Sequence, residues 1–142
     1  MELFDPDDID EAREDAESVM FDTCVIDRPG VPVTDAAGVV TTPKTRVYPT
    51  PAEIADGNPG RCKVQQTIAQ GGGPVAGGHV FIVQDGRLDL PVSAGPFAVD
   101  DVATLTSSLK TPHLVGNIYR MAEVYEKSYP SAQRIRVKQV TA

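Results

Sequence analysis

Apolar residues near the N-terminus recur at helical spacing. Four of them follow the 3.6-residue period: Ile9, Ala12, Ala16 and Val19. Two of the four are alanines, so the apolar stripe is thin and buries little surface. Asp5 and Pro6 suit the cap and the first position of a helix. The pattern predicts a helix from about Pro6 to Met20 that lies on a surface or on a neighbouring subunit.

From Phe21 onward the pattern changes to period two, which is typical of strands. Cys24 and Ile26 share one face of the first run, and residues 34–38 predict the turn of a first hairpin. Residues 49–60 contain three prolines and two glycines and predict a loop. The run that follows alternates again, with Cys62 and Val64 facing inward.

Later segments supply the remaining strands. Residues 80–83 predict a short strand, and Asp85-Gly86 is the strongest hairpin-turn dipeptide in the chain. Pro91 lies in the alternating run beyond it and predicts an edge strand, because proline cannot donate to a ladder. Three further strands are predicted at 102–107, 117–125 and 134–140.

These elements predict a mainly β fold: a small β-barrel or sandwich of about seven strands with an N-terminal α-helix. We expect an acidic helical arm at residues 1–20 and a β-barrel domain at residues 21–142. No run is long and apolar enough for a membrane span, which predicts a protein made and kept in a cytosol-like compartment.

Charge is distributed unevenly along the chain. The net charge is −7, but residues 1–22 hold ten acids and one base, so the rest of the chain is slightly positive. In the last predicted strand Arg134, Arg136 and Lys138 alternate with apolar residues and form a basic outward stripe. An acidic head and a basic tail favour contacts between proteins over sequence-specific binding of nucleic acid. A solvated acidic helix without a partner is the plainer alternative.

Few residues are arranged for chemistry. Cys24 and Cys62 are 38 positions apart, too far for a C-x-x-C motif, and are expected to be reduced core residues, with a disulfide between them as the alternative. The glycine-rich stretch from Gly71 to Gly78 lacks the Lys-Ser/Thr of a phosphate-binding loop and predicts a flexible connection. No hydrolase or metal motif is present, so we expect no catalytic residues, no metal, no cofactor and no enzymatic activity.

Several blocks carry a family resemblance. In chain order they are Phe21-Asp22-Thr23-Cys24-Val25-Ile26, the turn Asp35 to Gly38, Gly60-Arg61-Cys62-Lys63-Val64-Gln65, Asp101-Val102-Ala103-Thr104-Leu105-Thr106, and a C-terminal block from Leu114 to Arg120 that continues through Lys127-Ser128 into Ala132 to Val137. In these blocks the chain resembles the head-to-tail stopper, or head-closure, proteins of long-tailed actinobacteriophages. It departs from their pattern in two loops, at residues 49–60 and 71–73.

The resemblance implies a virion neck protein that is assembled in the host cytoplasm. Such a protein forms a homo-oligomeric ring below the portal and its adaptor, closes the DNA channel and joins the tail. Its implied partners are copies of itself, the portal adaptor and the tail terminator or tail tube, and packaged DNA only passes through the channel. A tail terminator, another neck protein, or a stand-alone β-barrel module that binds a small ligand or peptide are the alternatives.

Two groups of residues are predicted to have a role in assembly. The first places a subunit or partner contact between the acidic helix and the basic stripe of a neighbour, using these residues: Asp7, Asp8, Glu11, Glu14, Asp15, Arg134, Arg136 and Lys138. The second makes the glycine-rich stretch a movable channel loop, using these residues: Gly71, Gly72, Gly73, Pro74, Gly77 and Gly78.

Overall fold

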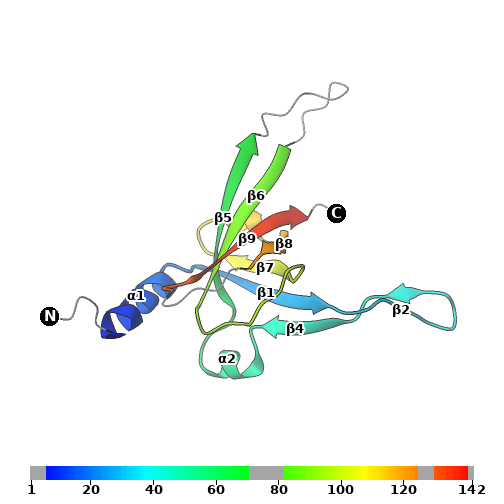
Figure 1. The fold of residues 1–142 in the computed structure, drawn as a ribbon, viewed down its shortest axis with the longest axis horizontal. Coiled ribbons are helices and arrows are strands. Elements are labelled where there is room, and N and C mark those ends of the chain that lie inside the picture. The colour runs from blue at the N-terminus through cyan, green and yellow to red at the C-terminus, as the bar shows by residue number, and fades with distance from the viewer. Residues whose placement is uncertain (1–5, 71–81, 125–129, 141–142) are drawn as a thin grey trace.

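The computed structural model describes residues 6–70, 82–124 and 130–140 (Figure 1). Its elements in chain order are α1 (Pro6–Ser18), β1 (Asp22–Pro29), β2 (Val33–Thr34), β3 (Val40–Thr41), β4 (Lys44–Tyr48), α2 (Pro51–Ala55), β5 (Arg61–Gln70), β6 (Ile82–Leu90), β7 (Val102–Ser108), a 3-10 turn η1 (Pro112–Leu114), β8 (Ile118–Glu123) and β9 (Gln133–Val140). No described helix has the length and apolar character needed to cross a membrane.

The larger sheet closes into a six-stranded antiparallel barrel. Its strand order is β4-β1-β5-β6-β9-β8-β7, and a further pairing between β1 and β7 joins the two ends of the barrel. The strand β4 is an extra strand, paired with the second half of β1 outside the barrel. The prediction of a mainly β fold with an N-terminal helix is therefore confirmed, and of the two architectures considered the barrel is correct.

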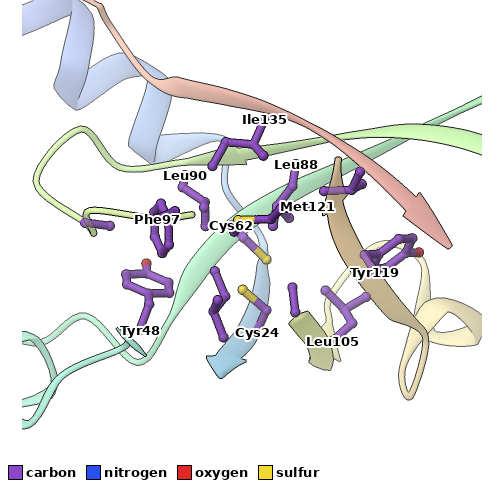
Figure 2. Close-up of a cluster of buried hydrophobic side chains, with 14 residues drawn as sticks. Cys24, Tyr48, Cys62, Leu88, Leu90, Phe97, Leu105, Tyr119, Met121 and Ile135 are labelled. Atoms are coloured by element: carbon purple, nitrogen blue, oxygen red, sulfur yellow. The ribbon is translucent and has the colours of Figure 1, made fainter. Parts of the chain in front are cut away.

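The inward positions of the barrel strands form one core. Cys24 and Ile26 on β1 are buried together with Leu88 on β6 and Val137 on β9, as their alternation predicts. Figure 2 shows the sulfur atoms of Cys24 and Cys62 facing one another inside this core. Both cysteines are free and buried, so the prediction of reduced core residues is confirmed.

Two predictions about β6 are wrong. The Asp85-Gly86 dipeptide forms no turn, because β6 runs through it from Ile82 to Leu90. A side chain at Gly86 would come within 3.3 Å of the Gln65 carbonyl oxygen and a Val137 methyl group, so the glycine allows close packing between strands. Pro91 does not mark an edge strand either: β6 lies between β5 and β9, and the proline follows its last residue.

The predicted loop at residues 49–60 contains the short helix α2. A capping box starts it, because Thr50 Oγ1 accepts the Glu53 N–H at 3.3 Å and Glu53 Oε1 accepts the Thr50 N–H at 3.3 Å. Tyr48 ends β4 before this helix, and Arg61 begins β5 after it. The Tyr48 hydroxyl donates to the Arg61 carbonyl at 2.7 Å and so joins the two ends of the segment that contains α2.

Gly60 lies at the point where β5 approaches β1. Its φ is +111°, and its carbonyl accepts the Cys24 N–H at 2.9 Å. A Cβ at this position would collide with the Cys24 carbonyl oxygen, whereas one at Gly57 (φ +89°) would meet open space.

We expect Gly60→Ala to lower the free energy of unfolding by about 2 kcal/mol more than Gly57→Ala does. Both variants strain a positive φ, but only the first also forces two backbones apart. Urea titrations followed by far-UV circular dichroism measure both values. Equal losses in the two variants would show that the close approach at Gly60 imposes no constraint.

The Cys62 thiol links stability to alkaline pH. The adjacent Cys24 thiol and burial both raise the pKa of the Cys62 thiol. Above the usual thiol pKa of about 8.5, the unfolded chain loses this proton while the folded chain keeps it, so the folded state becomes less stable as pH rises. We expect this thiol alone to contribute a slope of about 1.4 kcal/mol per pH unit.

Cys62→Ala should therefore give a shallower decline in unfolding free energy between pH 8 and pH 10. Comparing slopes, rather than absolute stabilities, separates the titration from the loss of packing that the alanine itself causes. Denaturant titrations at four or five pH values measure the slopes. Parallel profiles for the two proteins would contradict the assignment.

Candidate subunit-contact surfaces

The acidic helix α1 is hardly covered by its own chain. None of its residues from Asp7 to Ser18 is buried, and the five acids of the contact hypothesis are all exposed: Asp7, Asp8, Glu11, Glu14 and Asp15. Ile9, Ala12 and Ala16 are half-buried, as expected from a thin apolar stripe. The helix therefore presents its acids to solvent or to a partner.

One hydrogen bond shows where α1 lies. The Arg13 Nε donates to the Pro130 carbonyl at 3.1 Å, three residues before β9 begins. Figure 1 accordingly shows α1 beside the start of β9. The acidic helix and the basic stripe thus begin on the same side of the subunit, and a contact between them in different copies stays a prediction.

The basic stripe on β9 belongs to a wider face. Arg134, Arg136 and Lys138 are exposed and alternate with the buried Ile135 and Val137, as predicted. Register extends this face onto both neighbouring strands, since Arg87 on β6 is opposite Arg136 and Arg120 on β8 is opposite Lys138. We call the resulting set the basic face: Arg87, Arg120, Arg134, Arg136 and Lys138.

Acidic partners neutralise part of the basic face. Glu123 lies 3.6 Å from Arg136. Asp100 lies 3.2 Å from Arg120. Asp89 lies 3.0 Å from Arg87 and is largely buried. The sequence did not predict that Arg87 and Arg120 lie beside the basic stripe, because only the pairing of distant strands brings them next to β9.

The candidate channel loop lies outside the described residues. The strands on either side of it, β5 and β6, pair as far as Gln70 and Ile82. The assignment of Gly71, Gly72, Gly73, Pro74, Gly77 and Gly78 to a movable channel loop stays a prediction.

A projecting hairpin is the surface that sequence reasoning did not assign to any contact. We call residues 30–43 the hairpin arm; it contains β2 and β3 and extends from the ends of β1 and β4 (Figure 1). The predicted turn at residues 34–38 is confirmed: the Asp35 carboxylate accepts the N–H groups of Ala37 at 2.8 Å and Val39 at 2.9 Å, and Gly38 has φ +81°.

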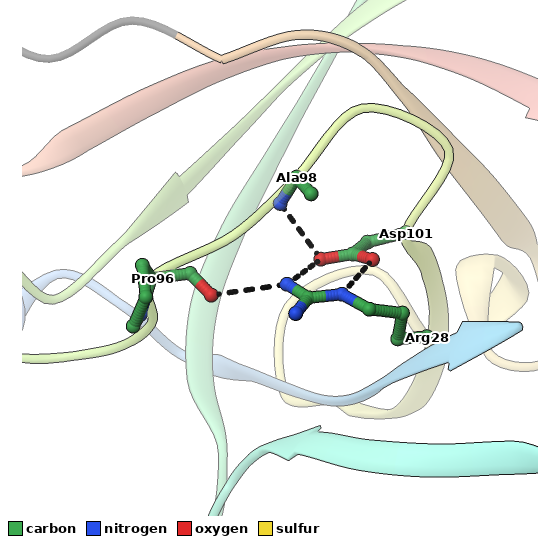
Figure 3. A network of polar contacts seen from close by, with 4 residues as sticks. All are labelled: Arg28, Pro96, Ala98 and Asp101. Atoms are coloured by element: carbon green, nitrogen blue, oxygen red, sulfur yellow. Dashed lines mark hydrogen bonds and ion pairs between the residues drawn. The ribbon is translucent and has the colours of Figure 1, made fainter. Parts of the chain in front are cut away.

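A charged clamp holds the base of the hairpin arm against the barrel. Arg28 donates from Nε and Nη2 to both oxygens of Asp101, at 2.9 and 3.0 Å, and from Nη2 to the Pro96 carbonyl at 3.2 Å (Figure 3). The Ala98 N–H donates to the same carboxylate at 2.8 Å. Asp101 is only 1% exposed, so its charge depends on these donors, whereas Arg28 is half-exposed.

We expect Asp101→Asn to lower the free energy of unfolding by about 2 kcal/mol, because the amide can accept hydrogen bonds at only one of the two buried oxygen positions and leaves donors of this network without an acceptor. The matched control is Asp27→Asn, which removes the more exposed pair formed by Asp27 and Arg46 at 2.8 Å. That variant should lose about 1 kcal/mol or less. Thermal or urea unfolding measures both, and comparable losses would refute the special role of the clamp.

Within the described part of the chain, no group of three His, Cys, Asp or Glu side chains is placed to hold a metal ion. The buried thiols of Cys24 and Cys62 belong to the core, and the ion pairs belong to strand faces and to the base of the hairpin arm. The candidate sites among the described residues are therefore contact surfaces: α1, the basic face and the hairpin arm.

Comparison with known proteins gives a family and no relative of known activity. No curated protein and no solved structure matches the chain. A family model described as a family of unknown function, DUF6093, matches residues 12–138, which covers the second half of α1 and the barrel except the last two residues of β9. The chain belongs to this family of unknown function, DUF6093.

Proposed function

We propose that this protein is a structural component of a phage virion, a stopper in the head-to-tail connector. Copies of the chain form a ring below the portal and its adaptor, close the DNA channel and provide the docking surface for the tail. The observation that carries the proposal is the hairpin arm, which projects from a compact barrel with all four of its valines exposed: Val31, Val33, Val39 and Val40.

Exposing these four valines to water costs free energy. Apolar surface that projects into water is unfavourable unless a partner covers it, and large exposed apolar areas mark interaction sites. The barrel itself has its own core and does not need the hairpin arm to close. A segment that the domain does not need for folding is suited to holding subunits together.

The charge distribution supports the same proposal. The acids of α1 and the cations of the basic face are separate surfaces of opposite sign on one small subunit. A closed ring joins two different surfaces of each copy, and opposite charges on those surfaces favour one register over others. The basic face of one copy can then bind the acidic helix of a neighbouring copy or an adaptor subunit.

The proposal has a direct test with purified heads. Phage heads that carry portal and adaptor but no tail are mixed with the purified protein, and retained DNA is measured by nuclease protection. We expect the protein to bind these heads and to reduce DNA leakage. A variant with Arg134→Glu, Arg136→Glu and Lys138→Glu should bind at least about tenfold more weakly, because it loses charge complementarity.

The matched control reverses three exposed cations elsewhere: Lys44, Arg46 and Arg61. It should bind like the wild type. Protein that ignores heads but binds isolated tails would overturn the stopper role in favour of a tail terminator. Protein that binds neither would overturn the connector proposal and favour a stand-alone binding module, the remaining alternative.

A further inference from the structure

We propose that the hairpin arm of one copy docks on an apolar patch of a second copy, formed by Val19, Phe21 and Leu109. The proposal assigns the subunit contact of the ring, and in that respect it rests on the proposed function.

Apolar residues lie on both faces of the hairpin arm. Val33 is opposite Thr41, and Thr34 is opposite Val40. Side chains alternate along each strand, so Val33 and Val40 project from opposite faces, and Val31 and Val39 lie next to the two strands in sequence. The four valines expose between 54% and 79% of their surface.

The hairpin arm brings almost no charge into a contact. Asp35 is the only charged residue between positions 30 and 43, and its carboxylate already accepts two backbone N–H groups of the turn. Burying the hairpin arm therefore desolvates few charged side chains. Its two strands are only two residues long, and an isolated two-stranded hairpin is marginally stable in water. Both facts favour an apolar docking surface.

A suitable surface is found where β1 and β7 meet. The Leu109 N–H donates to the Phe21 carbonyl at 3.4 Å, and the β1–β7 register that pairs Asp22 with Ser108 places Phe21 opposite Leu109. Directly opposed residues of antiparallel strands project to the same face. Val19, two residues before Phe21 in the sequence, is included as the third apolar residue of the patch, and the three expose between 45% and 69% of their surface.

The charges next to the two surfaces are complementary. The Lys110 Nζ lies over the Phe21 ring, 5.8 Å from its centre, so a cation adjoins the apolar patch. The only charge of the hairpin arm is the negative Asp35. A contact between the arm and the patch therefore brings opposite charges together around an apolar centre, as in interfaces with a polar rim.

The position of the two surfaces identifies the occupant as a second copy. The patch is built around the residues just before β1, and the hairpin arm follows its last residue, Pro29. Eight residues of strand, about 25 Å, separate them. Figure 1 shows the hairpin arm pointing away from the barrel, so it does not fold back onto the patch of its own chain. Two different surfaces make a head-to-tail contact, which closes into a ring when the rotation between copies permits.

The test is crosslinking between two variants, each of which adds one surface cysteine to the wild-type chain. Val33→Cys and Leu109→Cys proteins, one carrying a size tag, are mixed and oxidised, both in concentrated solution and on tailless heads. The native Cys24 and Cys62 are buried and stay unreactive while the protein is folded. We expect a mixed disulfide at least about tenfold more abundant than in a control mixture of Val33→Cys with Ile54→Cys. Ile54 is a matched control, since it is apolar and 56% exposed on α2.

A second measurement avoids any dependence on disulfide geometry. Val33→Asp should weaken self-association at least tenfold, as measured by sedimentation in solution and by occupancy on heads, and Ile54→Asp should leave it unchanged. Equal effects of these two variants, or equal crosslinking at Leu109 and Ile54 in both settings, would overturn the assigned contact.

The outcomes separate this contact from the proposed function. Protein that seals heads without any excess of crosslinks at Leu109 overturns the contact and supports the connector. Protein that crosslinks through Val33 and Leu109 but does not bind heads supports the contact and overturns the connector.

Discussion

The architecture depends on β1 pairing along both of its edges. One edge is occupied by β7 from Asp22 to Asp27, and this pairing closes the barrel. The other edge is shared: β5 pairs with its first two residues, and β4 pairs from Ile26 onward. The exchange takes place at Cys24, whose N–H donates to the Gly60 carbonyl. Because β4 joins β1 next to this residue, residues 26–48 continue beyond the barrel as a two-stranded ribbon that ends in the hairpin arm.

The same exchange of partners along β1 sets the boundary between the buried core and the projecting surface. Ile26 and Tyr48, which face each other where β4 joins β1, are fully buried, whereas no residue of the ribbon is buried beyond Val47 on β4 and Asp27 on β1. Arg28 stands at this boundary and ties the ribbon to the segment before β7 through Asp101. Up to Ile26 and Tyr48, the ribbon is stabilised by packing in the core. At Arg28, its base is held by the hydrogen bonds and the ion pair with Asp101.

Local patterns predicted the parts of the fold that are decided locally. The alternation around Cys24, the turn after Thr34 and the two faces of β9 all follow from residues close in sequence. The capping box of Thr50 and Glu53 was also visible as a T-x-x-E pattern, and it would have revealed α2 within the predicted loop.

Features decided by distant pairing were mispredicted or missed. The local preference of Asp85-Gly86 for a turn loses to ladders with β5 and β9 on both sides. The basic face needed the register of three strands before Arg87 and Arg120 joined Arg136 and Lys138. The hairpin arm was recognised as a hairpin, but its exposure depends on where the barrel ends, which no short segment reveals.

The clamp between Arg28 and Asp101 gives the hairpin arm the mechanics of a lever. The pivot is a bidentate contact between rigid groups, and the apolar residues lie farther out, with only the turn at Asp35 beyond them. In a lever of this kind, a rotation of a few degrees at the pivot becomes a displacement that grows with distance along the arm. If the arm joins neighbouring copies, the angle held by one buried carboxylate also sets the angle between subunits, and thereby how many of them close a ring.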